Sequence, residues 1–261
     1  MDSLKTALEA FPSRFPALRD FRYFEQTDST NRQARQLGQA KTPAPCLVVA
    51  EGQSAGRGRL GRRWESPPGQ GLYFSLLLQP QIPAERAPLL TLATGLAIKR
   101  ALENFGVKDL VVKWPNDIVI QGKKVGGVLS EMETSGSQML FVILGVGLNI
   151  SQKKSDFPPE LQETAASLEQ LYPGDWHRSE VLEKILGELF QEIENLEADK
   201  VDELLKRWEG ESGFLGKKIK VEKSGQQLQG MVQGLDPEGH LLLETAPGKI
   251  VTLIAEDTTL I

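Results

Sequence analysis

Apolar residues occur along the chain in two patterns, continuous runs and a repeat of three to four positions, and the two patterns predict different elements. Continuous apolar runs at 46–50 and 72–78 indicate buried strands, because a short run without alternation fits a strand that is covered on both faces. After Pro88 the apolar residues instead recur every three to four positions, which predicts an amphipathic helix that Gly106 closes. The buried stripe of this helix is expected to comprise Leu89, Leu92, Ala93, Leu96, Ala97, Ala101, Leu102 and Phe105.

Shorter periodic segments complete a domain that combines hairpins with helices. Residues 28–31, Asp-Ser-Thr-Asn, predict a helix start whose polar side chains cap the first turn. Gln121-Gly122 is typical of the tight turn of a hairpin. The segment 1–20 is expected to hold at most one short helix. We expect strands over 110–114, 118–120, 125–131 and 141–144, and a mostly helical stretch over 179–208.

The pattern changes beyond Gly213, where glycine and proline turns separate short strands. The expected strands are 218–222, 227–234, 240–244 and 249–254. Roughly fifty residues of this pattern predict a small antiparallel barrel. We therefore divide the chain into an N-terminal extension (1–20), a main α/β domain (21–212) and a C-terminal barrel (213–261).

Composition and charge narrow the class of protein. The chain has 261 residues and a net charge of −5, which argues against general nucleic-acid binding because phosphate contacts require positive charge. Cys46 is the only cysteine, so no internal disulfide is expected, and its apolar neighbours favour a buried side chain over a nucleophile. His177 and His240 lie in loop-like contexts, which argues against a histidine metal site or a catalytic triad. Without an apolar run of about 18 residues or a secretory signal, the sequence predicts a soluble, cytoplasmic protein.

One short run departs from this acidic background. Positions 56–63, Gly-Arg-Gly-Arg-Leu-Gly-Arg-Arg, carry four arginines and three glycines. Arginine offers planar, bidentate contacts to phosphate or carboxylate, and glycine lets the backbone approach a bound group closely. A solvated basic turn, or an arginine–glycine patch for RNA, is the alternative. The position of the run between the strands 46–50 and 72–78 favours an ordered anion site.

Charged residues also interrupt otherwise apolar strands. Lys113 and Asp117 lie at the break between two expected strands, and Lys124 follows the next turn. Lysine and aspartate are rarely buried unless paired, so Lys113 and Asp117 could form a purely structural ion pair. Together with the arginine run, however, one carboxylate and several cations match what a nucleoside triphosphate and its Mg²⁺ require. P-loop and dinucleotide-binding glycine motifs do not occur in the sequence, which disfavours those two kinds of nucleotide site.

Five ordered blocks of residues resemble the signature blocks of the biotin–protein ligases. The blocks are Ser29-Thr30-Asn31, the segment 53–62, Lys113-Trp114-Pro115-Asn116-Asp117, the segment 124–129 and Gly145-Val146-Gly147-Leu148-Asn149. They cover about residues 22–150, and the most specific are the arginine-containing segment and the Lys-Trp-Pro-Asn-Asp block. The C-terminal barrel fits the family less specifically.

The resemblance implies a fold, a reaction and a partner. The implied fold is α/β, with a mixed, largely antiparallel sheet packed by helices as in class II synthetases and biotin ligases, followed by an SH3-like barrel. The implied reaction joins biotin and ATP, with Mg²⁺, into biotinyl-5′-AMP. Biotin is then transferred to a lysine of a biotin carboxyl carrier protein, a subunit of acetyl-CoA carboxylase. No covalent enzyme intermediate is needed, in agreement with the absence of a plausible nucleophile from the motifs.

The resemblance also implies roles for individual residues. Biotin is expected to contact Ser29, Thr30, Asn31, Gln53, Gly56, Arg57, Lys124 and Gly127. ATP and the adenylate are expected to contact Arg57, Gly58, Arg59, Arg62, Trp64, Lys113, Asn116 and Asn149. The expected catalytic residues are Arg57, Lys113, Asp117 and Lys124, and Asp117 is also the expected metal ligand. Arg63 is expected to be only a solvated charge.

Both ends of the chain depart from the family pattern. Only about twenty residues precede the matching part, where bifunctional members carry a DNA-binding domain. We therefore expect a monofunctional ligase that does not bind DNA. The segment 254–260 lacks the glycine expected in the last strand turn, so no nucleotide or carrier contact is assigned to the barrel.

Other functions are open from the sequence alone. A lipoate–protein or octanoate–protein ligase would share the fold, but its glycine-rich loop differs from the arginine-dense one. A non-catalytic biotin or nucleotide-binding regulator would not need Lys113, Asp117 and Lys124 together with Arg57. RNA binding is disfavoured because the loop occurs once and Trp64 is its one nearby aromatic residue. A membrane partner is not expected, and a homodimer is a further option.

Overall fold

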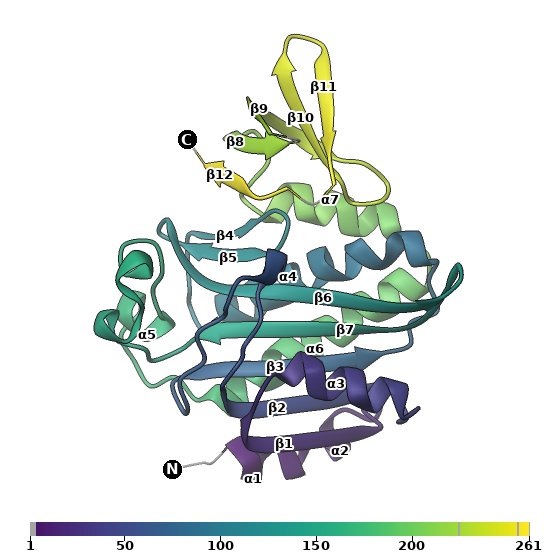
Figure 1. Cartoon of the computed structure of the whole chain (residues 1–261), viewed down its shortest axis with the longest axis vertical. Helices are drawn as coiled ribbons and strands as arrows, with labels where there is room; N and C mark the ends of the chain where they lie inside the picture. Colours follow the sequence, from purple (N-terminus) through teal and green to yellow (C-terminus); the bar gives the residue numbers. More distant parts are fainter. Residues whose placement is uncertain (1–3, 224, 255, 261) are drawn as a thin grey trace.

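Two β-sheets of different size organise the chain (Figure 1). The computed structural model describes residues 4–223, 225–254 and 256–260. Positions 1–3, 224, 255 and 261, which fall in the predicted N-terminal extension and barrel, lie outside the described residues. The strands of the large sheet are β1 (Asp20–Thr27), β2 (Cys46–Gln53), β3 (Gly71–Leu78), β4 (Leu110–Lys113), β5 (Asp117–Ile120), β6 (Lys123–Ser135) and β7 (Gln138–Asn149). Those of the small sheet are β8 (Lys218–Lys223), β9 (Gln226–Leu235), β10 (Leu241–Ala246), β11 (Lys249–Leu253) and β12 (Thr258–Leu260).

The helices are mostly short, apart from two long ones that cover the large sheet. The α-helices are α1 (Leu4–Glu9), α2 (Phe11–Arg14), α3 (Thr30–Gln39), α4 (Ala87–Asn104), α5 (Leu168–Leu171), α6 (Arg178–Glu197) and α7 (Val201–Glu211). Short 3₁₀ turns are η1 (Arg59–Gly61), η2 (Ala84–Arg86), η3 (Lys154–Asp156) and η4 (Pro159–Leu161). Among the described residues, no helix combines the length and apolar character that crossing a membrane requires.

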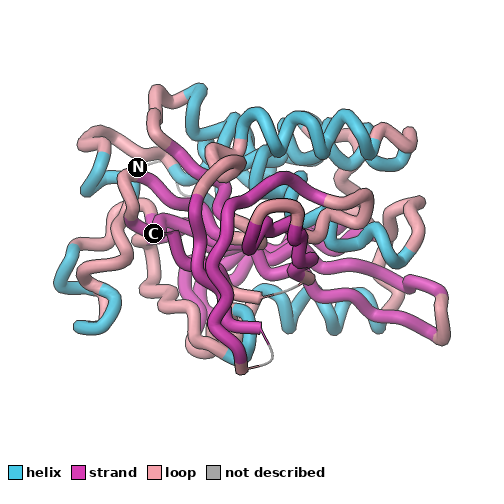
Figure 2. Tube along the Cα trace, turned by 90° about the horizontal axis from the view of Figure 1, so that it is seen from above, coloured by secondary structure: helices cyan, strands magenta, loops and turns pink. Residues whose placement is uncertain are grey.

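The large sheet is mixed but mainly antiparallel, as predicted. Its strand order is β1-β2-β3-β7-β6-β5-β4, and only the pairing of β1 with β2 is parallel. Central strand β3 is buried along its whole length, which explains why its residues form a continuous apolar run rather than an alternating one. Figure 2 shows helices on both sides of the strands, so both faces of the sheet are covered.

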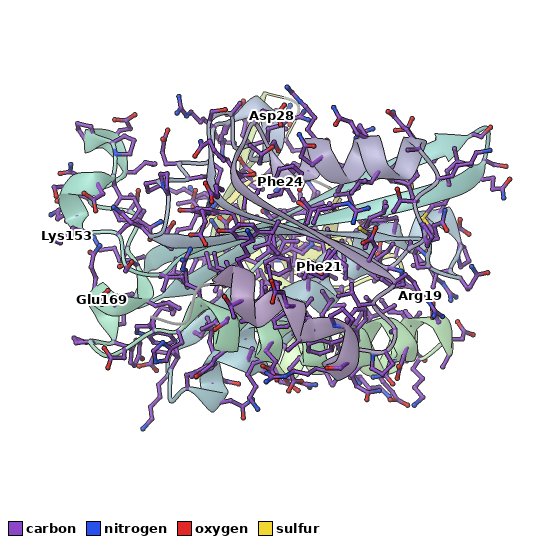
Figure 3. All side chains as sticks on the ribbon, turned by 90° about the horizontal axis from the view of Figure 1, so that it is seen from below. Arg19, Phe21, Phe24, Asp28, Lys153 and Glu169 are labelled. Atoms are coloured by element: carbon purple, nitrogen blue, oxygen red, sulfur yellow. The ribbon has the colours of Figure 1, made fainter. Side chains whose placement is uncertain are left out.

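Each face of the large sheet has its own apolar core. The larger core contains Leu72, Phe74 and Leu76 of β3 together with the buried stripes of α4 and α6. The smaller core lies under α3 and includes Leu77 of the same strand. Strand β1 shows the same division, because Phe21 packs against the larger core and Phe24 against the smaller one (Figure 3).

Helix α4 confirms most of the predicted buried stripe. Its predicted apolar positions are buried up to Leu102, and Gly106 closes the helix with φ of +82°. The prediction was wrong for Phe105, which is 37 % exposed. The helix ends at Asn104, so the periodic pattern that places a side chain on the buried face no longer holds at Phe105.

The N-terminal segment contains two helices, which corrects the prediction of at most one. Pro12 lies at the start of α2, where its missing N–H is tolerated, but proline cannot continue the preceding helix α1. Leu4, Leu8 and Phe11 are nevertheless buried in the larger core. The predicted helical stretch 179–208 is likewise two helices, α6 and α7, and Asp199 between them has φ of +60°.

The small sheet is antiparallel throughout, in agreement with the predicted SH3-like barrel, and its strand order is β11-β10-β9-β8-β12. Figure 1 shows the small sheet above β4, β5 and α7. Hydrogen bonds join it to Trp114. Trp114 Nε1 donates to the carbonyl of Gly239 at 3.1 Å, and Thr258 Oγ1 donates to the carbonyl of Trp114 at 2.9 Å. The first bond attaches the turn between β9 and β10, and the second places Thr258 beside the β4–β5 turn.

Candidate active site

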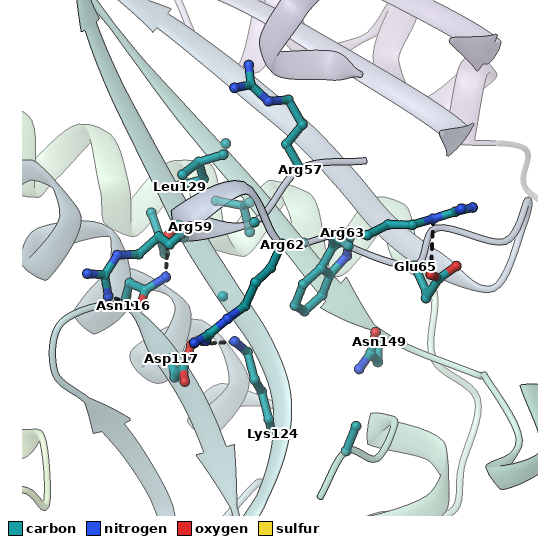
Figure 4. Close-up of a pocket in the computed structure, with 18 of the residues that line it drawn as sticks. Arg57, Arg59, Arg62, Arg63, Glu65, Asn116, Asp117, Lys124, Leu129 and Asn149 are labelled. Carbon is teal, nitrogen blue, oxygen red and sulfur yellow. Dashed lines mark hydrogen bonds and ion pairs between the residues drawn. The ribbon is translucent and has the colours of Figure 1, made fainter. Parts of the chain in front are cut away.

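One cavity of about 770 Å³ lies between the large sheet, the arginine-rich loop and the last segment of the small sheet. We call residues 56–63 the arginine loop. Figure 4 shows the side chains of Arg59, Arg62 and Lys124 directed toward Asn116 and Asp117, whereas Arg57 and Arg63 point away from Asp117. The cavity therefore collects polar groups that are far apart in the sequence.

Three neighbouring strands bring two lysines to one carboxylate. The antiparallel register pairs Lys113 of β4 with Asp117 of β5, and Lys124 lies on the adjacent strand β6. Lys124 Nζ is 2.5 Å from Asp117 Oδ1, and Lys113 Nζ is 3.5 Å from Asp117 Oδ2. All three residues line the cavity, so the ion pair proposed from the sequence is real and also faces a ligand-sized space.

The arginine loop is held in an ordered, hairpin-like shape. Gly58 N–H donates to the carbonyl of Arg62 at 2.7 Å, and Trp64 N–H donates to the carbonyl of Gly56 at 3.0 Å. A side chain at Gly56 would place its Cβ 2.4 Å from the carbonyl oxygen of Trp64. Gly56 is thus required for the loop to close, and it is the one predicted site residue that does not line the cavity.

Two of the four loop arginines meet the small sheet. Arg59 Nη1 lies 3.2 Å from Asn116 Oδ1 and 3.2 Å from Asp257 Oδ1, and Arg62 Nη2 lies 2.6 Å from Asp257 Oδ2. Burial lowers the pKa of the Arg59 guanidinium, while the nearby carboxylates of Asp257 and Asp117 act in the opposite direction. Asp257 consequently stabilises two cations that would otherwise repel one another.

The other two arginines lie at the rim. Arg57 is about half exposed and its Nη1 is 3.3 Å from Glu131 Oε1. Arg63 Nε is 3.0 Å from Glu65 Oε1, and its side chain is 65 % exposed. Arg57 and Arg63 both border the cavity, but neither contacts the Lys113–Asp117–Lys124 cluster in this structure.

A polar wall is formed where helix α3 begins. Ser29 is the N-cap residue, as the predicted helix start required, yet its hydroxyl makes no capping bond, which corrects that part of the prediction. The N–H of Thr30 instead donates to Gln53 Oε1 at 2.8 Å, and the Asp28 carboxylate accepts the N–H of Ser29 at 2.6 Å. The Ser29 hydroxyl therefore does not satisfy the helix backbone, and Ser29 lines the cavity beside Thr30 and Gln53.

Trp64 forms an aromatic wall of the cavity. A Cβ atom at Gly147 would lie 2.5 Å from the indole, so the missing side chain lets Trp64 lie against β7. Lys124 Nζ is 5.6 Å from the centroid of the same indole, within cation–π range. Asn149 is held nearby, because it donates to the carbonyl of Ala166 at 3.1 Å and accepts from Gln152 at 3.2 Å.

The structure thus gathers nearly the whole predicted site around one cavity. The predicted residues that line it are Ser29, Thr30, Asn31, Gln53, Arg57, Gly58, Arg59, Arg62, Trp64, Lys113, Asn116, Asp117, Lys124, Gly127 and Asn149. Three further residues reach the cavity from the C-terminal segment and were not predicted: Asp257, Thr258 and Thr259. Their segment was set aside because it lacks the family's glycine, and no local pattern signals that Asp257 meets Arg59.

Among the described residues, no group of three or more metal-ligating side chains lines the cavity. The one such group in the described parts of the chain is Asp236, Glu238 and His240, in a turn outside the cavity. Asp117 belongs to no such group. One carboxylate fits a Mg²⁺ ion that is coordinated mainly by triphosphate oxygens and water.

Comparison with known proteins identifies the family of the chain. Residues 23–149 match the model of the biotin/lipoate A/B protein ligase family, and residues 214–255 match the biotin protein ligase C-terminal domain. The bifunctional ligase/repressor BirA of Bacillus subtilis is 35 % identical over 226 residues, which are 87 % of this chain and 70 % of that protein. The biotin–[acetyl-CoA-carboxylase] ligase of Mycobacterium tuberculosis is 31 % identical over 89 % of this chain and 85 % of its own length.

Among solved structures, the biotin protein ligase of Aquifex aeolicus in complex with biotin and ATP superposes with a TM-score of 0.78. It is 31 % identical in sequence, and the match covers 93 % of this chain and 98 % of the other. The fold is thus that of a protein ligase of the biotin/lipoate class. The chain belongs to the biotin protein ligase family, which confirms the resemblance found in its sequence blocks.

The contact between Asp257 and the arginine loop is testable without any ligand. Asp257→Asn removes the charge that pairs with Arg59 and Arg62, so the loop should open more often. Because a partly exposed ion pair stabilises by up to about 1 kcal/mol, trypsin should cut the loop up to about fivefold faster. The rate is measured by mass spectrometry of timed digests. Asp199→Asn, which removes the surface partner of Arg86, is the matched control. Equal loop cleavage in the two variants would contradict the holding role of Asp257.

Proposed function

We propose that this chain activates biotin with ATP as biotinyl-5′-AMP and transfers it to a lysine of a biotin carboxyl carrier protein. The observation that carries the proposal is the convergence of Lys113, Lys124 and two loop arginines on one cavity. A carboxylic acid and a triphosphate are both anions, and joining them requires cations between them. Family membership supports the choice of biotin as the acid.

The first step makes a mixed anhydride. A carboxylate oxygen of biotin attacks the α-phosphorus of ATP, and the bond from that phosphorus to the bridging oxygen of pyrophosphate breaks. In the proposal, Lys124 holds the biotin carboxylate and Lys113 stabilises charge on the α-phosphoryl group. Asp117 keeps the two ammonium groups close together, so the reacting anions are brought into line at little entropic cost.

The loop arginines are proposed to bind the nucleotide phosphates. Arg59 and Arg62 already point into the cavity, and a phosphate can replace Asp257 as their partner. Arg57 would have to leave Glu131 to reach the adenylate. That ion pair is half exposed and therefore weak, so a bound phosphate can displace it. Closure of the loop would exclude water, which otherwise hydrolyses the anhydride.

Asp117 would be the protein ligand of the Mg²⁺ ion that accompanies ATP, and the ion would neutralise part of the phosphate charge. The adenine is assigned to the wall formed by Trp64, and Asn116 and Asn149 to the length of the nucleotide. Biotin's ureido ring is assigned to Ser29, Thr30 and Gln53, whose hydroxyl and amide groups suit a cyclic urea.

The second step needs no enzyme nucleophile. The amine of the carrier lysine attacks the acyl carbon of the adenylate, AMP leaves, and the amine loses a proton. Asp117 is the proposed proton acceptor because it is the carboxylate beside Lys113 and Lys124, where the acyl group is proposed to lie. Cys46 does not take part, since it is fully buried and burial raises the pKa of its thiol to about 11.

The polar wall favours biotin over lipoate or octanoate, whose acyl chains have no hydrogen-bonding ring. The intact cluster of Lys113, Asp117 and Lys124 favours an enzyme over a non-catalytic regulator. A cytoplasmic location, a homodimer and the absence of DNA binding stay predictions from the sequence.

The function is tested directly by carrier labelling. The purified chain, incubated with biotin, MgATP and an isolated carrier domain, should yield a carrier that streptavidin detects and whose mass has increased by one biotinyl group. Labelling should require ATP, because the carboxylate must first be activated. A carrier that accepts lipoate or octanoate but not biotin would overturn the assignment.

The Lys113→Ala variant distinguishes substrate binding from the chemical step. Because its partner charge develops only as the α-phosphoryl group reacts, Lys113→Ala should slow adenylate formation by about 100-fold. Biotin affinity should change by less than about threefold, because the lysine acts on the phosphoryl group. Quenched-flow measurement of the first turnover and calorimetric titration with biotin report the two quantities. The exposed Lys108→Ala is the control, and equal losses in binding and rate for Lys113→Ala would contradict the role.

A further inference from the structure

A buried serine lies behind the polar wall and connects two of its residues. Ser75 is fully buried in β3, where its register partners are Val48 and Gly145. Its Oγ is 2.8 Å from Thr30 Oγ1 and 2.6 Å from Asn31 Oδ1. Ser75 does not line the cavity. Its hydroxyl can affect a ligand only through Thr30 and Asn31.

The amide of Asn31 has a defined orientation. Its Nδ2 lies 2.8 Å from Glu131 Oε2 and 3.3 Å from the carbonyl oxygen of Leu129. Both partners are acceptors, so the nitrogen must face them and Oδ1 must face Ser75. Gly145 leaves the space for this arrangement, because a Cβ atom there would lie 1.9 Å from Asn31 Oδ1.

The number of available protons determines the direction of the hydrogen bonds that Ser75 makes with Asn31 and Thr30. The Ser75 hydroxyl has one proton, and Asn31 Oδ1 can only accept, so Ser75 donates to Asn31. The short contact between Ser75 and Thr30 then requires the proton of the Thr30 hydroxyl. Thr30 Oγ1 can then only accept a hydrogen bond from a ligand.

Gln53 presents the same kind of group beside Thr30. Its Oε1 accepts the N–H of Thr30 at 2.8 Å, while its Nε2 donates to Ser66 Oγ at 2.9 Å, so its amide orientation is also defined. Gln53 Oε1 lies 3.2 Å from Thr30 Oγ1, within reach of the Thr30 proton. The contact of Thr30 with Ser75 is shorter, at 2.8 Å, so we assign the Thr30 proton to Ser75, which leaves the contact with Gln53 without a proton. Two acceptors this close together are stabilised by a ligand N–H that bonds to both.

We infer that Ser75 is a positioning residue for substrate specificity. By taking the Thr30 proton, it turns Thr30 and Gln53 into a pair of acceptors that selects a substrate with an N–H donor at that point. The inference rests on the proposed function, in which the donor is a ureido N–H of biotin. Fatty acyl substrates such as octanoate and lipoate offer no such donor, so the same pair disfavours them.

The test compares biotin with its two cyclic carbamate analogues, in each of which a ring oxygen replaces one ureido N–H. Pyrophosphate release in the presence of MgATP gives kcat/KM for each compound. The wild-type chain should prefer biotin to at least one carbamate by about 100-fold or more, because that ring oxygen meets two acceptors. In Ser75→Ala the Thr30 proton is free to be donated to the ring oxygen. The preference should therefore fall to about tenfold or less, with KM for ATP unchanged.

Leu77→Val is the matched control, because Leu77 is buried on the same face of β3 two positions further on. It should lower the melting temperature without changing the preference for biotin. Where Ser75→Ala does not fold, Asn31→Ala carries the test, since it removes the acceptor of the Ser75 proton and should lower the preference in the same way. An unchanged preference in the folded variant would overturn the inference. A wild-type chain that releases no pyrophosphate with biotin would overturn the proposed function, and the inference with it.

Discussion

Pairing of each cation with a carboxylate is the constraint on which the site depends. Lys113 and Lys124 share Asp117, Arg59 and Arg62 share Asp257, and Arg57 contacts Glu131. Like charges about 4 Å apart repel by roughly 4 kcal/mol near a protein surface. Without the carboxylates, the cations could not be gathered around one cavity. With them, the cations stay in place and can exchange a carboxylate for a phosphate or for the acid to be activated.

The fold supplies these carboxylates from places that are distant in the sequence. Asp117 reaches both lysines because the β4–β5–β6 register places the three strands side by side. Asp257 reaches the arginine loop because the bonds between Trp114 and the small sheet bring the end of the chain to the cavity. The small sheet is therefore part of the site. A change that shifts the small sheet relative to the large sheet would move Arg59 and Arg62 before it moved the polar wall.

Local patterns in the sequence predicted a large part of this structure. The long apolar helix and the hairpins follow from periodicity, and the turn between β5 and β6 follows from Gln121 and Gly122, which both adopt positive φ. The site residues predicted from family motifs all line the cavity, apart from Gly56. The two N-terminal helices and the exposure of Phe105 were missed, because proline and a helix end interrupt patterns that continue in the sequence.

The residues that could not be predicted act through contacts between distant segments. Arg59 and Asp257 are 198 positions apart, and neither has a local signature that names the other. Ser75 stands in an apolar strand, where a single serine looks like an ordinary strand residue. Its importance depends on two side chains of α3, which only the packing of α3 on β3 brings within hydrogen-bonding distance.

The step proposed for this cavity joins the carboxylate of biotin to the α-phosphate of ATP. Exchange of radioactive pyrophosphate into ATP measures that step alone, without a carrier protein, because the step is reversible. Exchange should depend on both Mg²⁺ and biotin, and octanoate or lipoate should not support it. Exchange that proceeds equally well without biotin, or with octanoate in its place, would contradict it.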